Sequence, residues 1–277
     1  MSQMDERRSW AVPEGACDTH FHIYEPDHPM GPGSHIPAQP CSLVDYQKNV
    51  ARRLGVSRFV VVQPTAYGED NSVTLRAMAE LGNARGIAVL DENISDEKIV
   101  ALDTLGIRGF RFFSLSGDTG WDRVPKIAQR AADHGWHVQF QFDGAQLSAR
   151  APLLTSLPCD IVIDHIGRLH PPINDQDPQW KALRGLVDTG RCWVKLSAPY
   201  HGSKLGPPHY ADMGLFAQQL VLQAPERMLW ASNWPHPMVK SQFPDEQILL
   251  DVLREWVPDQ TTWHQVLVSN PAKLYRF

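Results

Sequence analysis

The stretch ACDTHFH, residues 16–22, is the first of eight short β-rich apolar runs in this 277-residue chain. Several of these runs are apolar almost throughout, which is typical of strands buried on both faces of a parallel sheet. Segments with helical spacing lie between them, for example 70–84, 95–106 and 121–135. The eight expected strands are 16–22, 58–64, 86–91, 109–113, 137–142, 160–165, 192–198 and 227–233.

Eight strand–helix units in a chain of this length predict a (β/α)8 TIM barrel. We expect one domain over residues 1–277, with 1–15 as an N-terminal arm. A doubly wound open sheet is the alternative, but that fold usually carries a Gly-rich phosphate loop after its first strand. Here the sequence HFHIYEPDHP, residues 20–29, stands in that place. The Pro- and Gly-rich stretch 25–40 is predicted to be a loop over the mouth of the barrel.

Polar side chains gather where the expected strands end, which is the edge at which barrels of this class place their functional sites. Burying such groups without partners is costly, so a site explains them better than a structural role does. The residues concerned are Asp18, His20, His22, Gln63, Thr65, Arg111, Gln139, Gln141, Asp164, His165, Arg168, Lys195, Ser197, Asn233 and His236.

His20 and His22 stand two residues apart, so their side chains should share one face of the first strand, with Asp18 deeper on that face. Two imidazoles on one face can chelate a divalent metal, and Zn or Mn held by His20, His22 and His165 is one hypothesis. The other is a site that works without metal. Lys195 could act as a Schiff-base nucleophile, but we interpret it as a buried cation paired with a carboxylate such as Asp164.

Bulk composition narrows the possible partners. The formal net charge of −5 and the lack of a basic run argue against a nucleic-acid surface. No apolar stretch reaches the length of a membrane span, and the N-terminal residues lack an apolar signal core. The four cysteines form no C-x-x-C pair, which is typical of reduced thiols in a cytoplasmic protein. We expect a monomer or homodimer whose partner is a small molecule.

Eight motifs spread over nearly the whole chain resemble the amidohydrolase superfamily, in the branch that contains 2-pyrone-4,6-dicarboxylate lactonase. The set is specific for the branch, although each motif alone is weak. The resemblance implies a (β/α)8 barrel, a cyclic ester as the substrate and a reaction without a metal cofactor. The motifs are DTHFHIYEP, VVVQPTAYGEDN, GIRGFRF, GWHV, IVIDHIGR, WVKLSAPY, WASNWPHP and SNPAKLYRF.

The resemblance also implies roles for individual residues. Histidines of the first and sixth strands polarise the lactone carbonyl or hold the attacking water, as in an oxyanion hole. Arginines bind the substrate carboxylate, and amide and hydroxyl groups touch the remainder. The catalytic set implied is His20, His22, His165, Asn233 and His236, and the substrate-binding set is Thr65, Arg111, Gln141, Arg168, Tyr200 and His201.

Asn233 departs from the family pattern, which keeps an Asp at this position as the base. An amide accepts no proton at neutral pH. Three explanations stay open. Asn233 is an engineered replacement of Asp; or it is native and a histidine, His22, His165 or His236, is the base; or the chain has lost catalysis and kept binding.

The residues around the expected pocket indicate its substrate. After Arg111 the chain reads FFSLSGD, without the second arginine of the lactonase loop. Tyr200, His201 and Lys204 occupy the place of another arginine. We therefore expect a lactone with fewer acidic groups than pyrone dicarboxylate, such as a sugar-acid lactone or a muconolactone.

The predicted function is hydrolysis of the ester bond of a small carboxylated lactone by metal-independent attack of water, in aromatic or sugar-acid catabolism. Three alternatives remain. They are a lactone isomerase of the same branch, a metal-dependent amidohydrolase or decarboxylase, and a catalytically silent lactone-binding protein.

Overall fold

Eight parallel strands form the centre of the molecule and neighbour one another in chain order. The computed structural model describes residues 10–31, 34, 36–115 and 120–277. The strands are rich in Val, Ile, Phe and Leu, as strands buried on both faces should be. They are β1 (Cys17–Phe21), β2 (Arg58–Val62), β3 (Ala84–Ala88), β4 (Ile107–Ser114), β5 (His137–Phe142), β6 (Ile161–Ile163), β7 (Cys192–Leu196) and β8 (Met228–Trp230).

The sheet closes on itself between its first and last strands. Just beyond β8, the backbone N–H of Asn233 donates to the His20 carbonyl oxygen at 2.8 Å. The backbone N–H of His22 donates to the Trp234 carbonyl oxygen, also at 2.8 Å. With the strand order, this closure confirms the predicted (β/α)8 barrel and excludes the doubly wound sheet.

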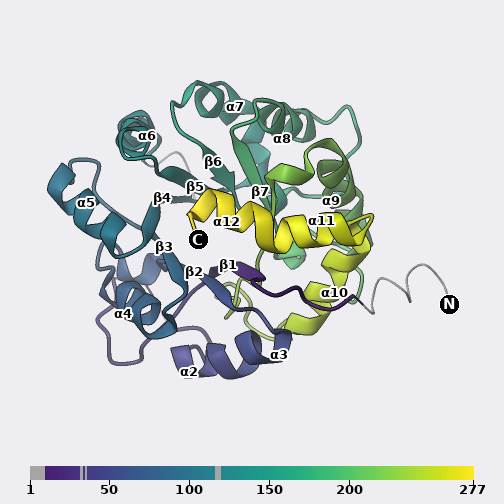
Figure 1. The fold of residues 1–277 in the computed structure, drawn as a ribbon. Helices are drawn as coiled ribbons and strands as arrows, with labels where there is room; N and C mark the ends of the chain where they lie inside the picture. Colours follow the sequence, from purple (N-terminus) through teal and green to yellow (C-terminus); the bar gives the residue numbers. More distant parts are fainter. Residues whose placement is uncertain (1–9, 32–33, 35, 116–119) are drawn as a thin grey trace.

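Helices surround the strands (Figure 1). Side-chain caps fix where several of them begin: Ser95 accepts from the Lys98 amide, and Asp245 accepts from the amides of Gln247 and Ile248. The described helices are α2 (Leu43–Tyr46), α3 (Arg52–Leu54), α4 (Ser72–Leu81), α5 (Asp96–Thr104), α6 (Val124–Asp133), α7 (Leu147–Ser156), α8 (Pro178–Asp188), α9 (Ala211–Gln223), α10 (Glu246–Trp256), α11 (Gln260–His264) and α12 (Asn270–Tyr275).

The C-terminal helices α11 and α12 cross in front of the strands in Figure 1. Tyr275 of α12 packs into the barrel against Cys17 and Trp193, which lie at the N-terminal ends of β1 and β7. This apolar plug fills the N-terminal end of the barrel. No helix in the described part of the chain is long and apolar enough to cross a bilayer.

The expected strands differ from the observed ones mainly at their ends. β3 covers Ala84–Ala88 rather than 86–91, because its pairing with β2 begins at Ala84 while residues after Ala88 leave the sheet. β4 is longer than 109–113, and β6 is shorter than 160–165. The predicted loop 25–40 does reach the mouth of the barrel, where the Gln39 amide contacts the Pro235 carbonyl oxygen; residues 32, 33 and 35 lie outside the described part.

Candidate active site

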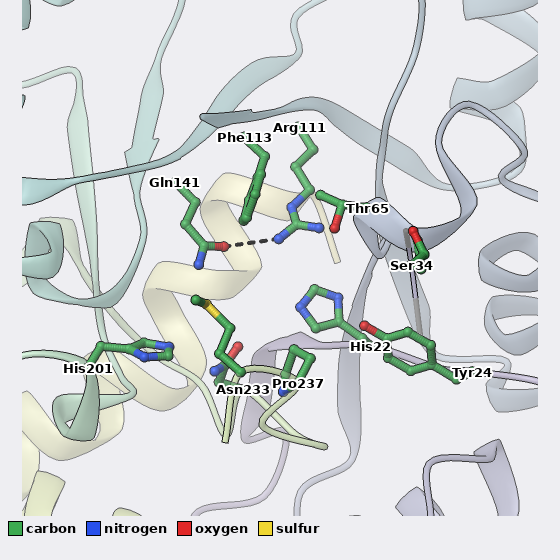
Figure 2. Close-up of a pocket in the computed structure, with 12 residues that line it drawn as sticks. His22, Tyr24, Ser34, Thr65, Arg111, Phe113, Gln141, His201, Asn233 and Pro237 are labelled. Atoms are coloured by element: carbon green, nitrogen blue, oxygen red, sulfur yellow. Dashed lines mark hydrogen bonds between the residues drawn. The ribbon is translucent and has the colours of Figure 1, made fainter. Parts of the chain in front are cut away.

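A cavity of about 220 Å³ opens beyond the C-terminal ends of the strands (Figure 2). Six of the predicted site residues line it: His22, Thr65, Arg111, Gln141, His201 and Asn233. The other five, His20, His165, Arg168, Tyr200 and His236, are not in its lining. Tyr24, Ser34, Ala66, Phe113, Pro237 and Met238 complete the wall.

Arg111 supplies a buried positive charge to the wall of this cavity. It is 8% exposed, its Nη1 donates to the Gln63 carbonyl oxygen at 2.6 Å, and its Nη2 donates to Gln141 Oε1 at 3.0 Å. No carboxylate in the described residues forms an ion pair with it. Burial lowers the pKa of its guanidinium, which nevertheless stays charged. Asp164 stabilises this charge only from a distance, because its direct ion pair is with Lys195. The cavity is therefore suited to an anionic ligand group.

His20 and His22 meet edge to edge in the barrel interior, with their Nε2 atoms 3.1 Å apart. The His22 Nδ1 lies 2.8 Å from the Val62 carbonyl oxygen, so it carries the proton and its Nε2 is an acceptor. His20 must then donate from Nε2. Burial lowers the pKa of His22 to about 3 and that of His20 well below its usual range, so both rings are neutral.

Lys195 sets this tautomer from the other side of the His20 ring. Its Nζ donates to His20 Nδ1 at 3.3 Å and to Gln139 Oε1 at 2.7 Å, and it lies 3.4 Å from Asp164 Oδ1. The Gln139 amide in turn donates to Asp164 Oδ2 at 3.0 Å. Asp164 Oδ1 also lies 3.3 Å from His20 Nδ1, but a proton there would leave two Nε2 lone pairs facing each other. The prediction that Lys195 is a buried cation paired with Asp164 is confirmed.

His165 begins a left-handed turn that is unusual for residues with side chains. His165, Ile166 and Arg168 have φ of 56°, 52° and 47°, and such strain is typical of functional sites. The turn fits because Gly144 packs against it: a Cβ at that position would lie 2.2 Å from the Arg168 carbonyl oxygen. The His165 Nδ1 is 2.9 Å from Ser197 Oγ, and its buried Nε2 has no partner among the described groups.

Arg168 follows at the end of this turn and lies at the margin of the site. Its Nη1 contacts the sulfur of Met238 at 3.9 Å, and Met238 lines the cavity. Its buried Nε has no partner among the described groups. The side chain is therefore near the cavity without forming its wall.

Asn233 is the first member of a chain of short hydrogen bonds that leads away from the cavity. Its Nδ2 donates to Tyr200 Oη at 2.7 Å, and that oxygen lies 2.7 Å from His236 Nδ1. The His236 Nε2 is 2.8 Å from Glu246 Oε1, at the first residue of α10. Asn233 and His236 both have left-handed backbones, with φ of 60° and 57°.

The orientation of one side chain, Asp18, differs from the sequence-based expectation. Asp18 does not share the face of His20: it accepts hydrogen bonds from Tyr46 Oη and Ser232 Oγ, on the outer side of β1. The alternation fails because the pairing of β1 with β2 shifts register between Asp18 and Phe21.

Several residues of the candidate site were not predicted from the sequence. Tyr24 and Phe113 stand two residues after His22 and Arg111 and also line the cavity, so strand alternation alone could have found them. No sequence pattern indicated Glu246 as a site residue, because it lies on a helix ten residues beyond His236 and contacts it only in the folded chain.

Comparisons with known proteins agree with this architecture. A family model described as amidohydrolase matches residues 17–277. The D-galactarolactone isomerase of Agrobacterium fabrum is 32% identical over 271 residues, which cover 96% of this chain and 92% of that protein. The 2-pyrone-4,6-dicarboxylate hydrolase of Comamonas testosteroni is 32% identical over 308 residues, covering 99% of this chain and 98% of that one.

Solved structures give the same result. An apo crystal structure from Agrobacterium tumefaciens has a TM-score of 0.88 and 32% identity, and covers 96% of this chain and 97% of its own. The family match spans nearly all of the described residues, and the relatives are aligned over nearly their full lengths. This chain belongs to the amidohydrolase family.

Proposed function

We propose that this chain catalyses acyl transfer at the ester carbonyl of a small carboxylated lactone, with water as the acceptor. The buried guanidinium of Arg111 carries the proposal, because it lies on the cavity wall with no carboxylate partner among the described residues. A substrate carboxylate would supply the missing charge. The two relatives named for lactone chemistry support the same class of substrate.

The histidines near the cavity suit the electrophilic side of this reaction. The Nε2 of His165 is buried and has no partner in the described part, so it is available to donate to the carbonyl oxygen when Ser197 donates to Nδ1. Both nitrogens of His22 already form hydrogen bonds, so this neutral ring lines the cavity and His20 holds it in one tautomer.

We propose that no resident metal takes part. The hypothetical donors are His20, His22 and His165, and the side-chain atoms of His20, Asp164 and His165 lie within 4.8 Å of one another. However, the Lys195 ammonium already lies within 3.4 Å of both His20 Nδ1 and Asp164 Oδ1. A divalent cation would have to share these groups with a buried positive charge, so the donor set does not fit one.

The cavity supports a substrate with one principal anionic group. Its wall carries hydroxyl and amide groups from Tyr24, Ser34, Thr65 and Gln141, and Arg111 is the guanidinium that lines it. Such groups suit the hydroxyls of a sugar-acid lactone, with a muconolactone as the second choice.

Isomerisation is a second candidate, and Asn233 favours it. Its Nδ2 faces Tyr200, which leaves Oδ1 as an acceptor able to orient a hydroxyl of the substrate itself. A substrate hydroxyl that attacks the ring carbonyl exchanges one lactone for another without adding water.

The test is turnover of a panel of pyrone dicarboxylate, muconolactones and aldaric-acid lactones. Hydrolysis releases a proton and adds the mass of water, whereas isomerisation changes the NMR spectrum at constant mass. We expect turnover of at least one lactone. Saturable binding without turnover would overturn the proposal and indicate a silent lactone-binding protein. A cytoplasmic location is also proposed, supported by four buried free cysteines.

A further inference from the structure

Acyl transfer to water needs a group that accepts a proton, and the Asn233 amide cannot be that group. A side chain in contact with Asn233 would have to take this part. Tyr200 Oη lies 2.7 Å from the Asn233 Nδ2. The same oxygen lies 2.7 Å from His236 Nδ1, and His236 Nε2 lies 2.8 Å from Glu246 Oε1. We call Tyr200, His236 and Glu246 the relay.

The donors and acceptors of the relay can be arranged in one consistent direction. A carboxylate accepts only, so Glu246 Oε1 takes the proton of His236 Nε2. The His236 Nδ1 is then an acceptor and receives the hydroxyl proton of Tyr200. The Tyr200 oxygen in turn accepts from the Asn233 amide, so every contact pairs one donor with one acceptor.

Burial and helix position support this direction. His236 is fully buried and Glu246 is 5% exposed, so the contact between them is shielded from water. Glu246 is the first residue of the eleven-residue helix α10, where the free backbone amides favour a negative charge. The carboxylate therefore holds the imidazole in the tautomer that accepts from Tyr200, as the acid does in a Ser-His-Asp triad.

We propose that Tyr200, backed by His236 and Glu246, is the proton acceptor of the reaction; this inference rests on the proposed lactone function. Water passes a proton to Tyr200 Oη as the Tyr200 proton moves to His236 Nδ1. The water oxygen bonds to the lactone carbonyl carbon, and the π electron pair moves to the carbonyl oxygen. When the ring C–O bond breaks, the proton returns from His236 through Tyr200 to the ring oxygen, giving the hydroxy acid.

Asn233 has a definite part in this scheme. Its Nδ2–H donates to the Tyr200 oxygen, where negative charge develops as the hydroxyl proton leaves. A carboxylate at this position would repel that charge. The amide at position 233 and the tyrosine at position 200 are thus complementary, and the base function lies one residue contact away from its usual place in the family.

The two nearby histidine alternatives are less suited to the task. Both nitrogens of His22 are engaged, by His20 and by the Val62 carbonyl oxygen. The His165 Nε2 carries a proton when Ser197 donates to its Nδ1, so it serves as a donor. Tyr200 does not itself line the cavity, but it is only partly buried and its ring lies 4.7 Å from the ring of His201 on the cavity wall. Its oxygen keeps one lone pair, which a water can reach from that side.

The first test compares Tyr200→Phe with Tyr210→Phe. Tyr210 is a buried tyrosine that lies outside the cavity lining and the relay. General acid–base catalysis contributes about 10²- to 10⁴-fold, so Tyr200→Phe should lower kcat by at least about 100-fold with little change in KM. Tyr210→Phe should stay within about twofold. A loss confined to KM, or no loss, would overturn the assignment.

Glu246→Gln and a spectroscopic readout address the positioning residues. In ¹⁵N-histidine NMR spectra, His236 should show a protonated Nε2 and an acceptor Nδ1. Tyr200→Phe should shift the Nδ1 resonance alone, and Glu246→Gln should change the tautomer and lower kcat without raising KM. A protonated Nδ1 in the unmodified protein at neutral pH would contradict the relay. If no lactone reacts, the proposed function fails, while these spectra still decide whether the relay exists.

Discussion

The Nε2 atoms of His20 and His22 lie 3.1 Å apart, at a separation where two lone pairs would repel. Either a proton or a cation must lie between them. Lys195 on the far nitrogen of His20 favours a proton, because it donates to Nδ1 and leaves Nε2–H to point at His22. The distance between the two rings therefore indicates that both histidines are neutral and that His20 carries its proton on Nε2.

Chelation should consequently leave the enzyme active. We expect substoichiometric Zn and Mn in the purified protein, and equal turnover before and after treatment with a strong chelator. Elemental analysis and initial rates on the same sample make the comparison. One equivalent of tightly bound metal, with activity lost on its removal and regained on its return, would show that the metal-independent proposal is wrong.

Arg111→Lys should raise KM for the carboxylated substrate by about 10- to 100-fold, with a smaller effect on kcat. Lysine has no planar fork, so it cannot keep the contacts to the Gln63 carbonyl and Gln141 while binding a carboxylate. A charged hydrogen bond contributes about 1.5–3 kcal/mol, which gives this range. Arg108→Lys, on the same strand but directed toward Asp103, is the matched control and should leave KM unchanged.

Buried neutral histidines should make this fold sensitive to acid. Burial lowers the pKa of His22, His137 and His201 to about 3. Because the folded-state pKa lies below the unfolded value of about 6.5, the stabilisation is present above that pH and is lost as the pH falls toward 3. The free energy of unfolding should decline by about 1.4 kcal/mol per pH unit for each such histidine.

His137 allows that expectation to be isolated, because it lies on β5 outside the cavity lining. Urea unfolding between about pH 6 and pH 4 should give a slope shallower by about 1.4 kcal/mol per pH unit in His137→Gln. His264→Gln, which changes an exposed histidine with no ion pair among the described residues, is the matched control. Parallel profiles for His137→Gln and the unmodified chain would contradict the prediction.

The barrel was predictable from sequence because buried parallel strands are apolar almost throughout, and eight such runs leave few other folds. The ends of β3 could not be predicted, since pairing with neighbouring strands rather than composition decides where a strand stops. The prediction that Asp18 shares the face of His20 and His22 was wrong, because strict alternation of side chains does not allow for a register shift. Glu246 could not be found, because its contact with His236 arises only when α10 packs beside the end of β8.

Asn233→Asp should transfer the base function from Tyr200 to position 233. The new carboxylate can accept a proton itself, and it also removes the N–H donor that stabilises the Tyr200 oxygen. Tyr200→Phe should therefore cost at least about 100-fold in kcat when position 233 is Asn, and less than about tenfold when it is Asp. Tyr210→Phe in both backgrounds reports any general loss of stability.

This double-mutant cycle separates the relay from independent contributions of the two residues. Tyr200 and Asn233 share a hydrogen bond, so the two substitutions are expected to be coupled in any case. If Asn233 were merely a disabled base, Asn233→Asp would raise kcat strongly and Tyr200→Phe would matter in neither background. Transfer of the base therefore requires more than coupling: Asn233→Asp must keep its kcat within about tenfold when Tyr200 is also replaced, and the coupling must appear in kcat and not in KM.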